Sequence, residues 1–362
     1  MRKLLLFSAS LLIAAGAVVW LSGRVRAQQA EEAPIPIRVV VVANFENGAD
    51  SGDAPGEYQD WVEREHLDEQ VPVRGAENVL RRNKDGLYGF IPRNGVADFA
   101  AFLLDPHFDL RKTYWLFTGI SGVDPRAASV GSAAWARWVV NGDQLREIDD
   151  RTIPKGWPYG LWPIGAPRPN ELPNDPNHFG SVTSLSQLSM AYELNQGLAR
   201  WAFDLTKDTP IPDSSAEIRE RRKAWKGFPE AQRPPFVLMG ETLGSVRYWH
   251  GDARTHWAED WVRLWTGGKG LFVMTNMESQ TYERLMLVFA RKGVVDRNRI
   301  LVLRTASNFS EPPPGVPVTA TIGDEAPGQV LAFDSNERVG APVVAELLAH
   351  WDRYENSIPT HD

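Results

Sequence analysis

The expected fold is decided by one stretch, LFVMTNMESQTYERLMLVFARKGVVDRNRILVLRTASNF, residues 271 to 309. An apolar run ends at Asn276, a helical apolar period follows Tyr282, and residues 300 to 303 are apolar and β-branched. The pattern predicts a strand, a short loop, a helix and a second strand. In such a βαβ unit both strands point the same way, so their carboxyl ends meet at one sheet edge, where ligands bind.

Polar side chains follow both of these strands. Met277 and Glu278 leave the first strand, and Ser307 and Asn308 leave the second. Methionine offers an adaptable apolar contact for a sugar face, and a carboxylate accepts hydrogen bonds from vicinal hydroxyls. An amide can donate to and accept from the edge of a heterocycle. The alternative interpretation is structural: Glu278 caps the helix and Asn308 turns the chain.

Residues 1 to 27 have the pattern of a signal peptide. Two basic residues, Arg2 and Lys3, precede an apolar run from 4 to 21, and Val-Arg-Ala at 25 to 27 places small residues at the cleavage site. We expect export to the periplasm or the extracellular space after cleavage. Left uncleaved, the same run is long enough to anchor the chain in a membrane.

The mature chain is expected to hold a leader over residues 28 to 36 and a single domain over residues 37 to 362. It carries a formal charge of −11, since residues 1 to 27 hold four basic residues and no acidic one. An acidic surface argues against nucleic acid as a partner. No other long apolar segment predicts multi-span membrane insertion, and the absence of Cys leaves stability to the core.

Strands alternate with helices along the whole chain, which predicts an α/β protein with a mostly parallel sheet and a hairpin insertion. A β-branched run over residues 36 to 43 is typical of a buried parallel strand. The Asn141-Gly142 pair predicts a hairpin between residues 132 to 140 and 144 to 148. The other predicted elements are strands over 86–91, 112–119 and 235–240, and helices over 56–70, 96–104, 184–206, 216–225, 252–266 and 341–354.

Two loops add candidate site residues. The loop from 44 to 57, after the first strand, is acidic, and its Glu46 is either solvated or a carboxylate that activates water; the loop fails the spacing of a calcium-binding EF-hand. The strand over 112 to 119 runs into Thr118-Gly-Ile-Ser121-Gly122. Glycine at a strand end lets the backbone approach a ligand, and a hydroxyl between glycines can donate to an anion.

These motifs together resemble the purine nucleoside phosphorylase superfamily, and specifically its exported branch, the purine nucleoside permease family. The phrases that carry the resemblance are TGISGVDPRAASVGSAAWARWVV, MTNME, GETLGSVRYWHG and VLRTASNFSEPPPG. The resemblance covers nearly the whole mature chain. It implies a nucleoside phosphorylase-like fold, with a three-layer α/β/α arrangement around a mostly parallel or mixed sheet and a partly closed barrel.

The resemblance also implies roles for named residues. Met277 and Glu278 match the pair that holds the ribose hydroxyls, and Asn308 falls where the purine is engaged at N7. The anion or water site is matched by Thr118, Ser121 and Gly122, and the position of the attacking water by Glu46. Asn44 and His250 are further candidates.

The first loop departs from the phosphorolytic members, which bring an Arg from this loop onto phosphate. Residues 44 to 63 contain no Lys or Arg. A desolvated phosphate needs cationic partners or several backbone amides. Hydrolysis is therefore expected over phosphorolysis, with phosphate retained as a possible co-substrate and no metal or other cofactor expected.

Three functions stay open at this point. The chain is an exported protein that binds and cleaves purine nucleosides, a component of nucleoside uptake that does not cleave them, or an inert storage-like scaffold. The second would require a separate membrane transporter as a partner. A homo-oligomer is compatible with all three.

Overall fold

A computed structural model describes residues 33–173, 190–323 and 326–360. The expected signal peptide and residues 28 to 32 of the expected leader lie outside these residues. The chain divides into two compact units, a small one of residues 1–35 and 106–108 and a large one of the remaining residues. In the small unit the backbone amide of Ile35 donates to the carbonyl of His107 at 2.7 Å.

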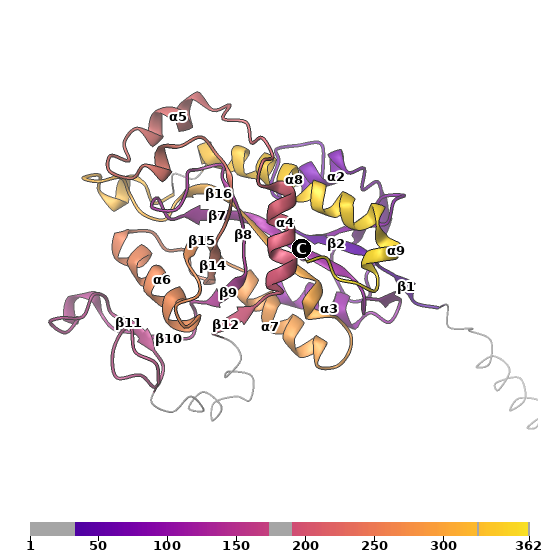
Figure 1. Cartoon of the computed structure of the whole chain (residues 1–362), viewed down its shortest axis with the longest axis horizontal. Helices are drawn as coiled ribbons and strands as arrows, with labels where there is room; N and C mark the ends of the chain where they lie inside the picture. The colour runs from indigo at the N-terminus through magenta and orange to yellow at the C-terminus, as the bar shows by residue number, and fades with distance from the viewer. Residues whose placement is uncertain (1–32, 174–189, 324–325, 361–362) are drawn as a thin grey trace, which may run out of the picture. The chain divides into compact units, whose positions relative to one another are not determined.

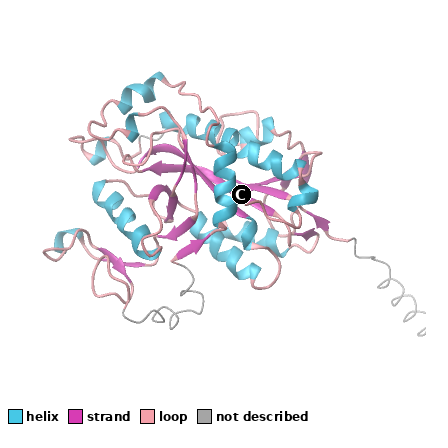
Figure 2. Cartoon of the chain, viewed as in Figure 1, coloured by secondary structure: helices cyan, strands magenta, loops and turns pink. Residues whose placement is uncertain are grey.

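A twelve-stranded mixed sheet organises the large unit (Figures 1 and 2). Its strands are β2 (Val39–Val42), β3 (Glu69–Val71), β4 (Leu80–Arg82), β5 (Leu87–Phe90), β7 (Tyr114–Val123), β8 (Ala133–Trp135), β9 (Trp138–Asn141), β12 (Ala191–Glu193), β13 (Val237–Met239), β14 (Glu241–Gly244), β15 (Phe272–Asn276) and β16 (Ile300–Phe309). Two further pairs stand apart: β1 (Ile35–Pro36) with β6 (Phe108–Asp109), and β10 (Leu145–Glu147) with β11 (Leu161–Pro163).

The helices are α2 (Gln59–Arg64), α3 (Val96–Leu104), α4 (Gln196–Thr206), α5 (Ala216–Arg222), α6 (Asp252–Trp265), α7 (Ser279–Ala290), α8 (Ala326–Ala349) and α9 (Trp351–Tyr354). Short 3₁₀ turns are η1 (Asp150–Thr152), η4 (Glu230–Gln232), η5 (Arg297–Arg299) and η6 (Val318–Ala320). Among the described residues no helix is long and apolar enough to cross a membrane.

The sheet is covered on both faces, because its central strands are buried all round. Val39 and Val41 of β2 pack in one core with Trp61 of α2 and with α8. On the opposite face Phe99 of α3 contacts Phe117 of β7, with ring centroids 5.6 Å apart. The expected α/β class, with three layers around a mixed sheet, is confirmed.

Part of the sheet closes into a ring. β16 runs parallel to β7 along its length and also pairs with β8, which leads directly into β9; β9 pairs with β14, and β14 with β15. β15 returns to the carboxyl end of β7 at a single antiparallel pair, Met274 with Val123. The helix expected within residues 271 to 309 is present, but the expectation that its two flanking strands run parallel is wrong. β15 is antiparallel to β7, whereas β16 is parallel to β7.

The expected hairpin at Asn141-Gly142 is also wrong. The amide of Asn141 donates to Met190 and that of Gly142 to Gly244, so the chain binds its neighbours β12 and β14 instead of folding back. A Cβ on Gly142 would lie 2.7 Å from a Leu243 methyl group. This glycine permits close packing and does not make a two-residue turn.

Three other boundaries differ from expectation. The helix predicted from 184 begins at Gln196, because Asn195 caps it by accepting from Leu198 at 3.1 Å, and β12 precedes it; residues 184 to 189 lie outside the described part. β7 continues through the expected glycine turn to Val123, since β16 pairs with it that far. The last long helix begins at Ala326 and holds Pro342 in its interior.

Candidate functional site

A buried arginine lies where β16 passes β7. Arg304 pairs in register with Gly119, and its side chain is 1% exposed. Its Nη2 donates to the Ser279 hydroxyl at the start of α7, and its Nη1 lies 3.6 Å from Oε2 of Glu278. A buried guanidinium is costly unless paired. Arg304 thus ties the middle of β16 to the end of β15.

A second carboxylate, Glu57, reaches the same place from the loop before α2. Its Oε2 accepts from the backbone amide of Asn44 at 2.9 Å and from the Asn44 side chain at 3.3 Å. Its Oε1 accepts from the Ile120 amide at 2.7 Å. Burial, together with the charge of Glu278, raises the pKa of Glu57 to about 7, although Arg304 opposes the shift. A carboxylate that titrates near neutrality suits general base catalysis.

Gly119 provides the space in which these groups meet. A Cβ at this position would lie 2.6 Å from Nη1 of Arg304 and 2.8 Å from both Nδ2 of Asn44 and Oε1 of Glu57. Nη1 of Arg304 and Oδ1 of Asn44 are buried and have no hydrogen-bond partner among the described residues. Above Gly119 a cationic donor, Nη1 of Arg304, therefore lies close to a carboxylate acceptor, Oε1 of Glu57.

The carboxylate of Glu278 does not cap the helix that follows it. Asn276 caps α7, because its Oδ1 accepts from the amides of Glu278 at 3.1 Å and Ser279 at 2.8 Å. Glu278 itself makes no side-chain cap and remains 32% exposed. Met277 is 41% exposed beside it. The structural alternative for Glu278, helix capping, is thus taken by Asn276.

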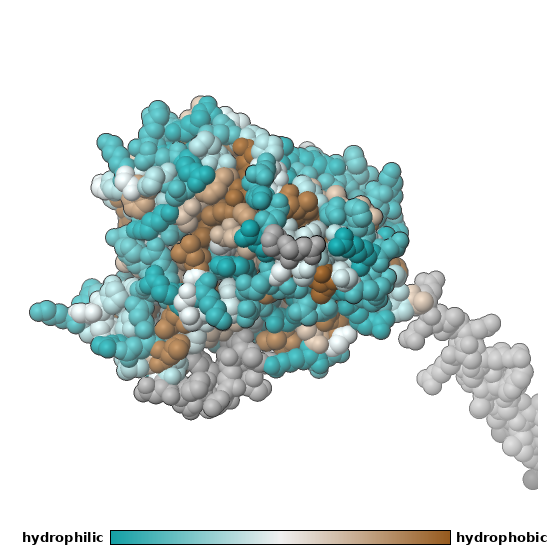
Figure 3. Space-filling view, in the orientation of Figure 1, coloured by the Kyte–Doolittle hydropathy of each residue, from teal (hydrophilic) through white to brown (hydrophobic). Residues whose placement is uncertain are grey.

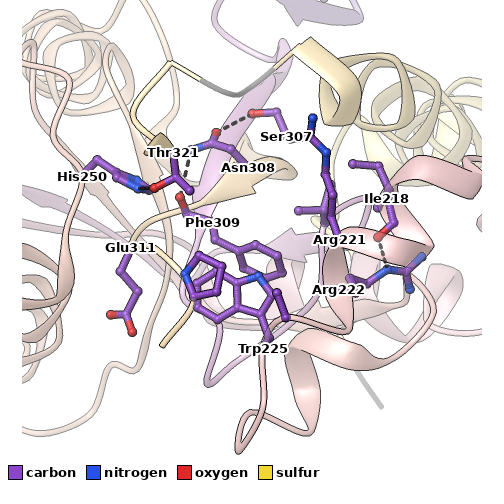
Figure 4. A pocket seen from close by; sticks show the side chains of 13 residues that line it. Ile218, Arg221, Arg222, Trp225, His250, Ser307, Asn308, Phe309, Glu311 and Thr321 are labelled. Carbon is purple, nitrogen blue, oxygen red and sulfur yellow. Dashed lines mark hydrogen bonds between the residues drawn. The ribbon is translucent and has the colours of Figure 1, made fainter. Parts of the chain in front are cut away.

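Asn308 lies beyond a bulge of β16 and lines a mostly apolar cavity of about 210 Å³ (Figure 4). Trp225 and Phe309 form an aromatic wall of this cavity, with ring centroids 4.2 Å apart. Nδ2 of Asn308 stands 3.2 Å from where a Cβ of Gly122 would be. The absent side chain at Gly122 lets the amide approach β7 closely.

The anion or water set predicted from the glycine turn is not held together. Leu116 of β7 packs toward α8, and strand alternation puts Thr118 on that same face. Gly119 and Ser121 share the opposite face with Phe117, whose ring contacts Tyr282 of α7. Thr118 therefore contributes its carbonyl, which accepts from Asn44 at 2.9 Å, while Ser121 can offer its hydroxyl on the Arg304 side.

Glu46 has a different environment from the one expected. Its carboxylate accepts from the backbone amides of Asn47 at 2.8 Å, Tyr58 at 2.8 Å and Gln59 at 2.7 Å, and so clamps its loop onto the start of α2. Glu57, which the sequence did not single out, holds the position beside Arg304. His250 donates to or accepts from Thr321 at 2.8 Å and lines the cavity next to Asn308 (Figure 4).

Apolar side chains surround these strand ends. Phe45, Val246 and Tyr248 are 36%, 60% and 44% exposed, and they follow β2 and β14. Figure 3 shows an apolar area between α5 and α6, in the region where β14 to β16 lie in Figure 1. Within the described residues no group of three or more His, Asp and Glu is arranged to hold a metal ion.

A model of the purine nucleoside permease family matches residues 36–359. The chain belongs to the purine nucleoside permease family. It is similar to a protein of Schizosaccharomyces pombe named "Probable purine nucleoside permease", with 27% identity covering 71% of this chain and 73% of that one. A purine nucleoside permease of Candida albicans is also 27% identical, and the matched region covers 73% of this chain and 63% of the Candida protein.

Solved structures with a similar course of the chain are nucleosidases. A 5′-methylthioadenosine/S-adenosylhomocysteine nucleosidase of Helicobacter pylori is 14% identical, with a TM-score of 0.48, covering 87% of this chain and 100% of that one. Futalosine hydrolase of the same organism is 12% identical, with a TM-score of 0.47, covering 86% and 98%. Both likenesses concern the course of the chain alone.

Proposed function

We propose that this chain binds purine nucleosides at the strand ends of β7, β15 and β16 and hydrolyses their N-glycosidic bond. One observation supports the proposal above the others: Glu57, Asn44 and Arg304 converge above Gly119, and the same arginine contacts Glu278. The family supplies the ligand class, and the converging groups supply the chemistry.

In the proposed reaction, Glu57 activates water at one end of the site and Asn308 stabilises the leaving base at the other. A water above Gly119 gives its proton to Glu57 as its oxygen bonds to C1′ of the ribose. The C1′–N9 bond breaks, and its electron pair goes to the purine. Positive charge builds on the ribose beside Glu278, and negative charge on the base, where Asn308 donates to N7. An amide cannot deliver a proton, so solvent protonates the leaving base.

The charge of the site favours water over phosphate as the nucleophile. Two carboxylates, Glu57 and Glu278, share one guanidinium, that of Arg304. A phosphate dianion placed among them would add like charge to a buried site. The loop over residues 44 to 63 brings no Lys or Arg to offset it.

Nucleoside capture for uptake is the second candidate, because the family is named for permeases. In this case the same side chains would hold the ligand without cleaving it, and a separate membrane protein would move it. Chromatography of inosine, adenosine and guanosine after incubation with the mature protein separates the two. We expect free base and ribose without added phosphate; cleavage that requires phosphate contradicts hydrolysis, and an intact bound nucleoside supports capture.

Replacing Glu278 with Ala is expected to weaken nucleoside binding by about 2 to 4 kcal/mol, because two ribose hydroxyls lose a charged acceptor. Calorimetric titration with inosine measures the change. Met277→Leu is the matched control, since it keeps the apolar contact at the adjacent residue. Unchanged inosine affinity in Glu278→Ala would show that the carboxylate does not contact the ribose.

We further propose that the mature protein acts outside the cytoplasm. The support is the basic start, the apolar run and the Val-Arg-Ala site within residues 1 to 27. Mass spectrometry of the protein from a periplasmic or culture fraction is expected to find a start near Gln28. Recovery of intact Met1 in the membrane fraction would indicate an uncleaved anchor.

A further inference from the structure

The side-chain amide of Asn308 is held in one orientation by two neighbours. Its Oδ1 accepts from the Ser307 hydroxyl at 2.9 Å, and one hydrogen of Nδ2 goes to the carbonyl of Phe309 at 3.0 Å (Figure 4). These contacts leave the second hydrogen of Nδ2 as the donor that Asn308 can offer to a ligand. The ligand-free protein already uses this donor.

The acceptor for this second hydrogen is the hydroxyl of Tyr248, which lies 3.3 Å from Nδ2 of Asn308. The contact is at the long end of hydrogen-bond distances, and the Tyr248 side chain is 44% exposed. Such a contact is weak and can be displaced. A base can take the Asn308 donor only if the phenol gives way.

The segment that carries Tyr248 is fixed at both ends. The amide of Ser245 donates to Asn276 at 2.9 Å, and that of Gly251 donates to Ser310 at 2.9 Å. Val246 is held by Asp143 at 3.0 Å. Tyr248 stands between these anchors, so a change of its side-chain rotamer moves the ring without moving the backbone.

A cavity next to Tyr248 can receive the rotated ring. It has a volume of about 290 Å³, and Tyr248 itself is part of its wall. Leu161, Trp249 and Ile322 give it an apolar lining on which a phenol ring can pack. His250 borders both this cavity and the one that Asn308 lines, so the two adjoin.

We propose that Tyr248 is a specificity-determining residue: it occupies the Asn308 donor until a base with a hydrogen-bond acceptor at that edge displaces it into the adjoining cavity. The inference depends on the proposed function, in which this acceptor is N7 of a purine. Displacing Tyr248 from Asn308 therefore costs binding free energy only for ligands that accept a hydrogen bond from Asn308. Ligands without N7 bind without moving the phenol.

The test compares inosine with 7-deazainosine, which lacks the N7 acceptor. Binding is measured by calorimetry in the Glu57→Gln background, with chromatography confirming that the ligand stays intact. Adding Tyr248→Phe is expected to strengthen inosine binding about two- to tenfold, the range of one net hydrogen bond, and to leave 7-deazainosine unchanged. Adding Asn308→Ala as well is expected to abolish the gain, because the two residues act as a pair.

Ile322→Trp supplies the converse variant. Ile322 is 49% exposed, so the larger ring fills the receiving cavity without entering the core. We expect weaker inosine binding and unchanged 7-deazainosine binding. Weaker inosine binding in Tyr248→Phe, or an equal change for both ligands, overturns the proposal while nucleoside binding stands. Failure of the Glu57→Gln protein and the wild type to bind inosine at all would remove the proposed function, and the role of Tyr248 with it.

Discussion

Replacing Glu57 with Gln is expected to lower the rate of nucleoside cleavage by about 10²- to 10⁴-fold, the usual contribution of a general base. Gln keeps the shape of the side chain and can still accept at one oxygen, so Asn44 and Ile120 retain part of their contacts. Inosine binding is expected to persist, because Glu278 and Asn308 are unchanged. Single-turnover chromatography measures the rate, and calorimetry measures the affinity.

Glu46→Gln is the matched control for this variant. Both residues lie in the loop between β2 and α2 and both are buried, but the Glu46 oxygens are taken up by backbone amides. A loss of loop structure would affect both variants, whereas a loss of the base affects Glu57→Gln alone. Cleavage that survives in Glu57→Gln and disappears in Glu46→Gln would restore Glu46 as the residue that activates water.

The pH dependence of cleavage follows from the raised pKa of Glu57. The base works in its ionised form, so the rate is expected to rise about tenfold per pH unit up to about pH 7 and to level off above it. The effect on stability has the opposite sign. Folding favours the protonated form, so the contribution of Glu57 to stability is full below its ordinary pKa of 4.5 and declines as the pH rises toward 7.

Local patterns predicted the elements that local forces determine. The helix expected over residues 96 to 104 is α3, bounded as predicted, because its apolar period ends at Asp105-Pro106. The strand expected over 86 to 91 is β5. In contrast, Asn141-Gly142 has the composition of a tight turn, yet two neighbouring strands bind its amides. Contacts distant in sequence outweigh turn propensity there.

The candidate site divides in the same way. Met277, Glu278 and Asn308 could be predicted, because each lies at the carboxyl end of a strand that is recognisable in the sequence. One stretch, residues 271 to 309, contains all three. Glu57 could not be found like this, because its position depends on how a 14-residue loop folds back onto β7. Arg304 did carry a signal, a lone charge within an apolar strand, which indicates a buried partner.

Replacing Gly119 with Ala is expected to lower the cleavage rate strongly, because Gly119 pairs with Arg304 and lies directly below the proposed catalytic groups. The new methyl group would lie within 2.8 Å of Oε1 of Glu57 and Nη1 of Arg304, closer than such atoms approach one another. Those groups are buried and tied to Asn44 and Ser279, so they cannot withdraw without breaking their own contacts. We expect a loss of about 10²-fold or more, as when a donor to a developing charge is removed.

Binding distinguishes this effect from general damage to the protein. Neither Glu278 nor Asn308 is among the nearest neighbours of the new methyl group, so inosine affinity in Gly119→Ala is expected to fall much less than the cleavage rate. Gly197→Ala is the control for the substitution itself, because its nearest neighbour would be a methyl group of Thr360 at 3.2 Å, and it lies on α4, an element that supplies none of the proposed site residues. Undiminished cleavage in Gly119→Ala would place the attacking water elsewhere, since the methyl group has to displace the Glu57 and Arg304 groups that are proposed to hold it.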